Sequence, residues 1–142
     1  MAETGARAGP RSAARRSALD ILYEADLLEL ELPVVLAKHL EGGEAAPDPY
    51  AVALVRGVDR RRGDLDARIR AAAQNWTLER MPLVDRNVLR LAVYELLERP
   101  EVPTAVVLNE AVELAKLLST ADSGRFVNGV LGQVAREARG AP

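Results

Sequence analysis

The 142-residue sequence contains no cysteine and a single histidine. These absences exclude disulfides, thiol nucleophiles and zinc sites of the cysteine–histidine kind, and they remove most histidine-based acid–base chemistry. The histidine, His39, is followed by a glycine-containing loop, so we do not expect a metal site with the nearby Glu41 and Glu44. We therefore predict that the chain is not an enzyme and that it holds neither a metal ion nor a cofactor.

Aromatic residues are also scarce, and no apolar run is long enough to cross a membrane. Because the chain has only one phenylalanine, one tryptophan and three tyrosines, its core must consist mainly of leucine, valine and alanine. Apolar residues recur at spacings of three and four rather than two, which favours packed helices over a sheet sandwich. The basic N-terminus is not followed by a signal-peptide core, so we expect a cytoplasmic protein.

Proline and glycine divide the chain into helical segments. Residues 1–10 are small and polar and predict a flexible N-terminal tail, whereas residues 11–139 are long enough for a single domain with one core. Residues 50–72 keep one helical register across Gly63, which favours one long helix, and residues 83–98 have the apolar circumference of a central buried helix. The breaks predict an all-α protein of about seven helices, with further segments at 12–32 (ended by Pro33), 34–40, 104–118 and 122–138.

The charge is distributed unevenly, although the net charge is only −2. Residues 17–50 are strongly acidic, whereas residues 1–16 contain one acidic residue and four arginines: Arg7, Arg11, Arg15 and Arg16. This asymmetry predicts a local basic surface on an acidic body. A solvated helix start is the alternative, but cations near a helix N-terminus oppose the helix dipole, and this penalty favours a binding role.

The segment DSGRFVNGVLGQV, residues 122–134, combines several unusual features. Asp122 is suited to cap a helix, and the first turn then carries Arg125 beside Phe126, the only phenylalanine. Gly129 and Gly132 fall inside the helix, where each costs up to about 1 kcal/mol relative to alanine. Missing side chains allow a close approach, so we expect either a neighbouring helix against these glycines or a ligand at the helix start.

The segment VPTAVVLNEAVELAKLLSTADSGRFVNGVLGQV closely resembles the C-terminal signature of the NusB transcription antitermination family. Upstream, VDRNVLRLAVYELL is similar to the central helix of that family, LVRGV to its third helix, and RSAARRSALDILYEA to its arginine-bearing first helix. The resemblance covers roughly residues 11–135. It implies two small helical bundles packed together, and a factor that binds the boxA segment of ribosomal RNA transcripts with NusE, a ribosomal protein, within the RNA polymerase antitermination complex.

The resemblance also implies roles for individual residues. Guanidinium groups neutralise phosphates, and an aromatic face stacks on a base, as single-stranded RNA recognition requires. The expected RNA-binding residues are Arg11, Arg15, Arg16, Asp122, Arg125 and Phe126. Tyr23 and Asp85 match family positions that contact NusE, and we expect them at a protein interface.

Two alternatives are open at this point. One is a helical protein–protein adaptor without direct RNA binding, in which the arginines only decorate the surface. The other is the N-terminal module of certain ribosomal RNA cytosine methyltransferases, which the domain also resembles. That second function would need a cofactor domain, and the sequence contains no glycine-rich strand–turn–helix segment for one.

Overall fold

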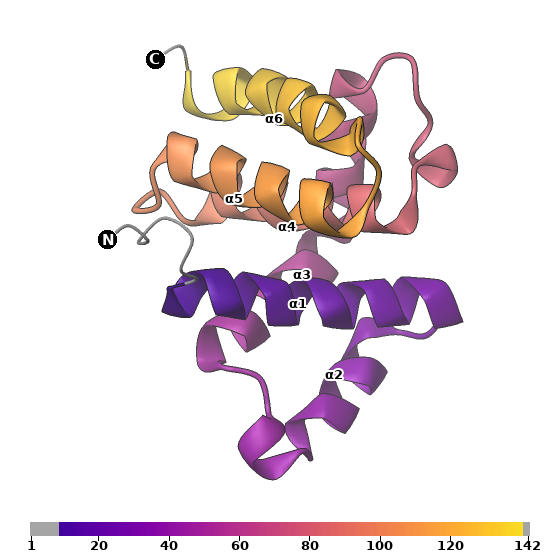
Figure 1. Cartoon of the computed structure of the whole chain (residues 1–142), viewed down its shortest axis with the longest axis vertical. Coiled ribbons are helices and arrows are strands. Elements are labelled where there is room, and N and C mark those ends of the chain that lie inside the picture. The colour runs from indigo at the N-terminus through magenta and orange to yellow at the C-terminus, as the bar shows by residue number, and fades with distance from the viewer. Residues whose placement is uncertain (1–8, 141–142) are drawn as a thin grey trace.

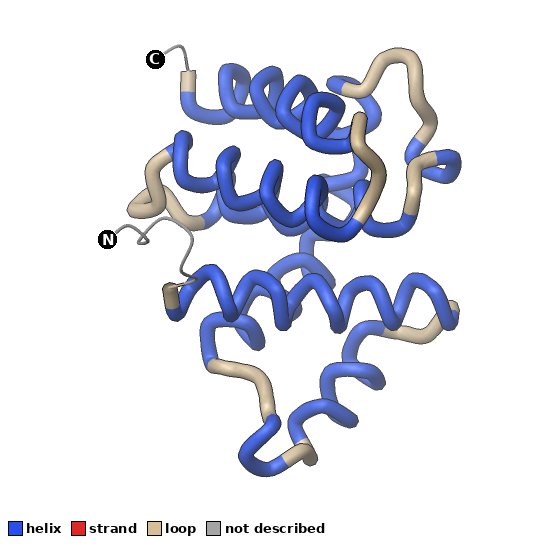
Figure 2. The backbone as a smooth tube through the Cα atoms, in the orientation of Figure 1, coloured by secondary structure: helices blue, strands red, loops and turns tan. Residues whose placement is uncertain are grey.

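The structure is a computed structural model that describes residues 9–140, and these residues form helices and no strands. The six α-helices are α1 (Pro10–Leu28), α2 (Leu32–Leu40), α3 (Pro49–Ala72), α4 (Leu83–Glu98), α5 (Thr104–Leu118) and α6 (Ser123–Arg139). Two short 3₁₀ turns, η1 (Gly43–Ala45) and η2 (Leu78–Arg80), lie in the loops (Figure 2). The all-α prediction is therefore confirmed. Of the predicted tail, residues 1–8 lie outside the described part, and Pro10 already belongs to α1.

The helices form two groups that share α3 (Figure 1). The helices α1 and α2 pack on each other and on α3, and α4, α5 and α6 form the second group, with α3 packed against α4 and α6. The helix α4 contacts α1, α3, α5 and α6, and every residue from Asn87 to Leu96 is buried. This confirms the prediction of a central helix at residues 83–98. Within the described residues, no helix is long and apolar enough to span a membrane.

The long helix α3 is continuous but kinked. Arg61 has non-helical backbone angles (φ −108°, ψ 16°), and its side chain bonds Asp64 and Glu98. Leu65 and Ile69 beyond the kink are fully buried, so the helical register predicted from the sequence is kept. The prediction of one helix at residues 50–72 is correct in extent, and the six α-helices of the described residues are close to the expected number of about seven.

The end of α1 differs from the expectation. Glu29 adopts a left-handed conformation (φ 56°) and ends the helix at Leu28, so that Pro33 lies in the first turn of α2 instead. Proline is well suited to that position because the first turn leaves backbone N–H groups without partners in any case.

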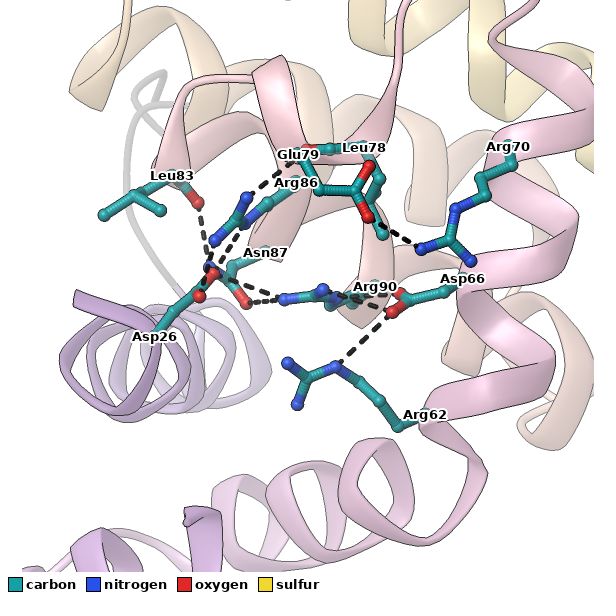
Figure 3. Close-up of polar contacts among 10 residues, drawn as sticks. All are labelled: Asp26, Arg62, Asp66, Arg70, Leu78, Glu79, Leu83, Arg86, Asn87 and Arg90. Atoms are coloured by element: carbon teal, nitrogen blue, oxygen red, sulfur yellow. Dashed lines mark hydrogen bonds and ion pairs between the residues drawn. The ribbon is translucent and has the colours of Figure 1, made fainter. Parts of the chain in front are cut away.

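A polar network joins α1, α3 and α4 (Figure 3). Asp26 on α1 accepts hydrogen bonds from Arg86 at 2.6 and 2.7 Å and from Asn87 at 2.8 Å, and Arg90 donates to Asp66 on α3 at 2.8 Å. Partial burial by itself would raise the pKa of Asp26, but the hydrogen bonds from Arg86 and Asn87 outweigh it and lower the pKa to about 2. The two helix groups are thus held together by charge as well as by apolar packing.

Candidate nucleic-acid and protein interface

The start of α1 presents two arginines to solvent. The Arg11 guanidinium lies 4.2 Å from the centroid of the Tyr50 ring and 3.7 Å from a Glu101 carboxylate oxygen, and about half of the Arg11 side chain is exposed. Arg16 is similarly exposed and pairs with Asp20 at 3.6 Å. Surface pairs of this kind contribute little to stability, so both guanidinium groups can exchange their present partners for phosphates.

Arg15 does not share this surface, although it was expected with Arg11 and Arg16 among the RNA-binding residues. It is 4% exposed, and its Nε and one terminal nitrogen donate to Glu95 of α4 at 2.8 and 3.0 Å. Its other terminal nitrogen donates to Glu110 at 3.2 Å, and the Tyr50 hydroxyl donates to Glu95 at 2.6 Å. A carboxylate in the middle of a buried helix needs a counter-charge, and Arg15 supplies it.

A pocket of about 410 Å³ lies at the start of α6. It brings together three residues predicted to be functional, Asp85, Asp122 and Phe126, with others that the sequence did not single out: Arg80, Met81, Pro82, Thr120 and Ser123. Trp76, which we had not assigned to a site, forms another wall. Its ring centroid lies 6.1 Å from that of Phe126 in an edge-to-face arrangement with an interplanar angle of 65°. Arg125, which directly precedes Phe126 in the chain, is exposed.

The start of α6 is stabilised by a different side chain from the one expected. Asp122 occupies the N-cap position, but its carboxylate makes no capping hydrogen bond. Ser123 provides polar contacts instead: its Oγ accepts from the Thr120 N–H at 3.2 Å and donates to Asp85 at 2.9 Å. The Asp122 carboxylate is therefore available to a ligand in the pocket.

The two residues expected to contact NusE lie in neighbouring turns of different helices. Asp26 of α1 bonds Arg86 of α4, which places the turn of α1 that carries Tyr23 beside the turn of α4 that carries Asp85. Tyr23 is half-buried. Asp85, however, is only 3% exposed, and its Oδ1 has no hydrogen-bond partner among the residues described. Its carboxylate thus lies inside the pocket wall, although Asp85 was expected at a protein interface.

Of the two explanations for the glycines in α6, the neighbouring helix is wrong within the described part of the chain. A Cβ at Gly129 would meet no atom within 4 Å, and one at Gly132 would meet only the end of the Arg136 side chain, at 3.6 Å. No helix packs against either position. The glycine that packing does require is Gly57 of α3, where the Tyr94 ring occupies the space a Cβ would need.

The basic start of α1 and the pocket at the start of α6 do not form one patch, although residues of both were expected to bind RNA. Figure 1 shows the start of α1 and the start of α6 on opposite sides of the molecule, with α5 between the two helices. At 1.5 Å per residue, the 15 residues of α5 span about 22 Å. A ligand that reaches both places must therefore be extended.

Comparison with known proteins identifies the family. The sequence model that describes the NusB family matches residues 12–136. This chain belongs to the NusB family. Among its relatives, the transcription antitermination protein NusB of Acidothermus cellulolyticus is 54% identical over 124 residues, which cover 87% of this chain and 86% of that protein. The corresponding protein of Saccharopolyspora erythraea is 50% identical over 129 residues, which cover 89% of this chain and 87% of that protein.

Solved structures of the NusB family share the fold. A structure of T. maritima NusB matches with a TM-score of 0.81 and 34% identity, covering 92% of this chain and 94% of that one. A structure of the antitermination factors NusB and NusE in complex with double-stranded RNA matches with a TM-score of 0.79 and 28% identity, covering 90% of this chain and 97% of that one. The two-bundle fold implied by the sequence signature is confirmed.

Proposed function

We propose that this chain is a transcription antitermination factor that binds boxA-containing single-stranded RNA of ribosomal RNA transcripts together with NusE, as part of the RNA polymerase antitermination complex. The pocket at the start of α6 carries the proposal, because the family signature there builds a hollow with an aromatic wall and a neighbouring exposed arginine. The solved relative that is described as a complex of NusB, NusE and RNA supports it. Such a factor binds rather than catalyses, and it acts in the cytoplasm, where transcripts are made.

The proposed RNA contacts follow from exposure. Arg11, Arg16 and Arg125 present guanidinium groups to phosphates, and Phe126 and Asp122 offer an aromatic face and hydrogen-bond acceptors to one base. Arg15 supports this surface from below: its bond to Glu95 holds α1 against α4, so that Arg11 and Arg16 project outward. Arg15 is thus proposed to act through its neighbours rather than on RNA.

The proposed NusE contact is the exposed side of α1 around Tyr23. Leu27 lies one turn after Tyr23 and is exposed, and Leu30 continues the apolar surface beyond the helix. Exposed leucines beside a half-buried tyrosine are typical of a protein-binding surface. Asp85 is buried, and its bond from Ser123 ties α4 to the start of α6, so its proposed role is to position these helices rather than to contact NusE directly.

Salt dependence tests the RNA contact. If Arg11, Arg16 and Arg125 each neutralise one phosphate, log affinity for single-stranded boxA RNA should fall with log salt at a slope of about −2.1. Arg16→Ala should make the slope shallower by about 0.7. Arg56→Ala is the matched control, because Arg56 is an exposed arginine in a groove between α2 and α3, and it should leave the slope unchanged.

The adaptor alternative predicts a different outcome, and the burial of Arg15 and the apolar surface around Tyr23 are the observations that favour it. A protein-only adaptor would show no salt-dependent RNA binding, with or without NusE. Capture of NusE by the chain should be lost in Tyr23→Asp under either function. Undiminished capture by that variant would show that the NusE surface lies elsewhere.

A further inference from the structure

Trp76 is the least expected side chain of the pocket. It is 52% exposed, although tryptophan offers more apolar area for burial than any other residue. The loop that carries it is anchored: the Trp76 backbone N–H donates to the Ala73 carbonyl at 3.0 Å, and Arg70 pairs with Glu79 at 3.1 Å (Figure 3). An indole that projects from an anchored loop and is half open to solvent is available for a ligand.

The surroundings of Trp76 fit a flat ring. Trp76 lines the pocket of about 410 Å³ and also a second hollow of about 340 Å³, which Arg70, Gln74 and Asn75 line among others. Because Phe126 approaches edge to face, the two rings do not stack on each other. An aromatic residue that borders two open spaces is suited to stack on a ligand rather than to fill a core.

The polar groups of the pocket favour a nucleobase over an apolar side chain. Asp122 and Thr120 line the same hollow as the two rings, and an inserted leucine or valine would desolvate them without offering hydrogen bonds. A base offers both a π-face and a hydrogen-bonding edge. Arg80 also lines the pocket, and neither it nor Arg125 makes an ion pair within residues 9–140, so both can meet the adjoining phosphates.

We propose that Trp76 is a nucleobase-stacking residue which, with Phe126, holds one unpaired base of the bound RNA. This rests on the proposed RNA-binding function and adds to it a second aromatic wall. The stacking face is tolerant of base identity, since every base has a π-face, while the Asp122 and Thr120 oxygens favour a base edge that donates hydrogen bonds.

The test uses a property of the chain itself, because Trp76 is its only tryptophan. Titrating the full chain with single-stranded boxA RNA, with and without NusE, should quench the tryptophan emission as the complex forms. Trp76→Ala should weaken RNA binding about tenfold, and Trp76→Phe should restore most of the affinity. The salt slope should stay the same in both variants, because no phosphate contact is lost. Val34→Ala, a truncation of an exposed apolar residue on α2, should change none of these quantities.

The outcomes separate this proposal from the function on which it rests. The stacking role would be refuted, with the RNA-binding function left in place, if RNA bound with the expected salt slope, did not change the tryptophan emission of the wild type, and bound Trp76→Ala with full affinity. Absence of RNA binding even with NusE present would refute the function itself. If NusE alone changes the emission and Trp76→Ala loses only NusE capture, Trp76 belongs to the protein interface and the proposal is wrong.

Discussion

Arg15 of α1 and Glu95 of α4, 80 positions apart in the chain, form a buried pair with two hydrogen bonds of 2.8 and 3.0 Å. Arg16, the next residue, lies on the surface. Two adjacent arginines of one motif therefore have different physical roles. One fixes the helix, and the other is free to meet a ligand.

The first prediction compares these two arginines. Arg15→Ala leaves Glu95 buried without its guanidinium partner and should lower the free energy of unfolding by about 3–5 kcal/mol. Arg16→Ala should change it by less than about 0.5 kcal/mol. Urea denaturation measures both. An Arg15→Ala variant of normal stability with weakened RNA binding would instead place Arg15 on the RNA.

The second prediction concerns acid stability. The pKa of Asp26 is about 2 in the folded chain, against an ordinary value of 3.8, so its ionised form stabilises the fold above that ordinary value. This contribution, roughly 2 kcal/mol, should disappear as the pH falls from about 4 through about 2. Denaturation curves between pH 2 and pH 7 should therefore show a steeper acid loss in the wild type than in Asp26→Asn, which is also less stable at neutral pH.

A control on the same helix is available for this measurement. Asp20→Asn removes an exposed carboxylate that pairs only with Arg16 at 3.6 Å among the described residues, and it should change stability by less than about 0.5 kcal/mol. An identical loss of stability below about pH 4 in the wild type and in Asp26→Asn would contradict the assignment of the low pKa to Asp26.

The third prediction concerns the end of α6. The Arg139 guanidinium donates to the carbonyls of Glu95, Leu96, Arg99 and Val102 and to the Thr104 hydroxyl, at 2.7–3.1 Å. Leu96 lies in the last turn of α4, where carbonyls lack helical partners, and the bonds to Arg99 and Val102 tie α6 to the loop between α4 and α5. Arg139→Ala should lower the free energy of unfolding by about 2–3 kcal/mol. Arg136→Ala, which removes only an exposed bond to Gln133, should have little effect; equal losses in the two variants would argue against the cap.

The fourth prediction contrasts two helical glycines. Gly57→Ala would place a methyl group in the space of the Tyr94 ring and should destabilise the fold by about 1–3 kcal/mol. Gly129→Ala meets open space and should stabilise α6 by up to about 1 kcal/mol. Thermal unfolding distinguishes the two. A destabilised Gly129→Ala variant would mean that the helix needs glycine there for its backbone.

Local sequence patterns could predict the helices because their causes are local. Residues 83–98 are apolar around most of the helix, and α4 has these bounds and is buried as expected. The kink at Arg61 escaped prediction because the side-chain partner beyond its own helix, Glu98, is 37 positions away. The left-handed Glu29 escaped because no glycine or asparagine marks that position.

The candidate site was only partly predictable, because most of its contacts join residues that are distant in the sequence. The Asp-Ser…Phe signature located the start of α6 correctly. The partners that define the site come from elsewhere in the chain: Trp76 contacts Phe126, 50 positions away, and Asp85 bonds Ser123, 38 positions away. The only tryptophan of the sequence, in the non-periodic stretch QNWTLER, was the one available signal, because such a residue has no helical apolar face to join.

The separation of Arg11 and Arg16 from the Phe126 pocket has a consequence for the transcript. Under the proposed function, an RNA that contacts both places must be long enough to span the roughly 22 Å of α5. Shorter oligonucleotides should contact only one of the two places and bind more weakly, whatever their sequence.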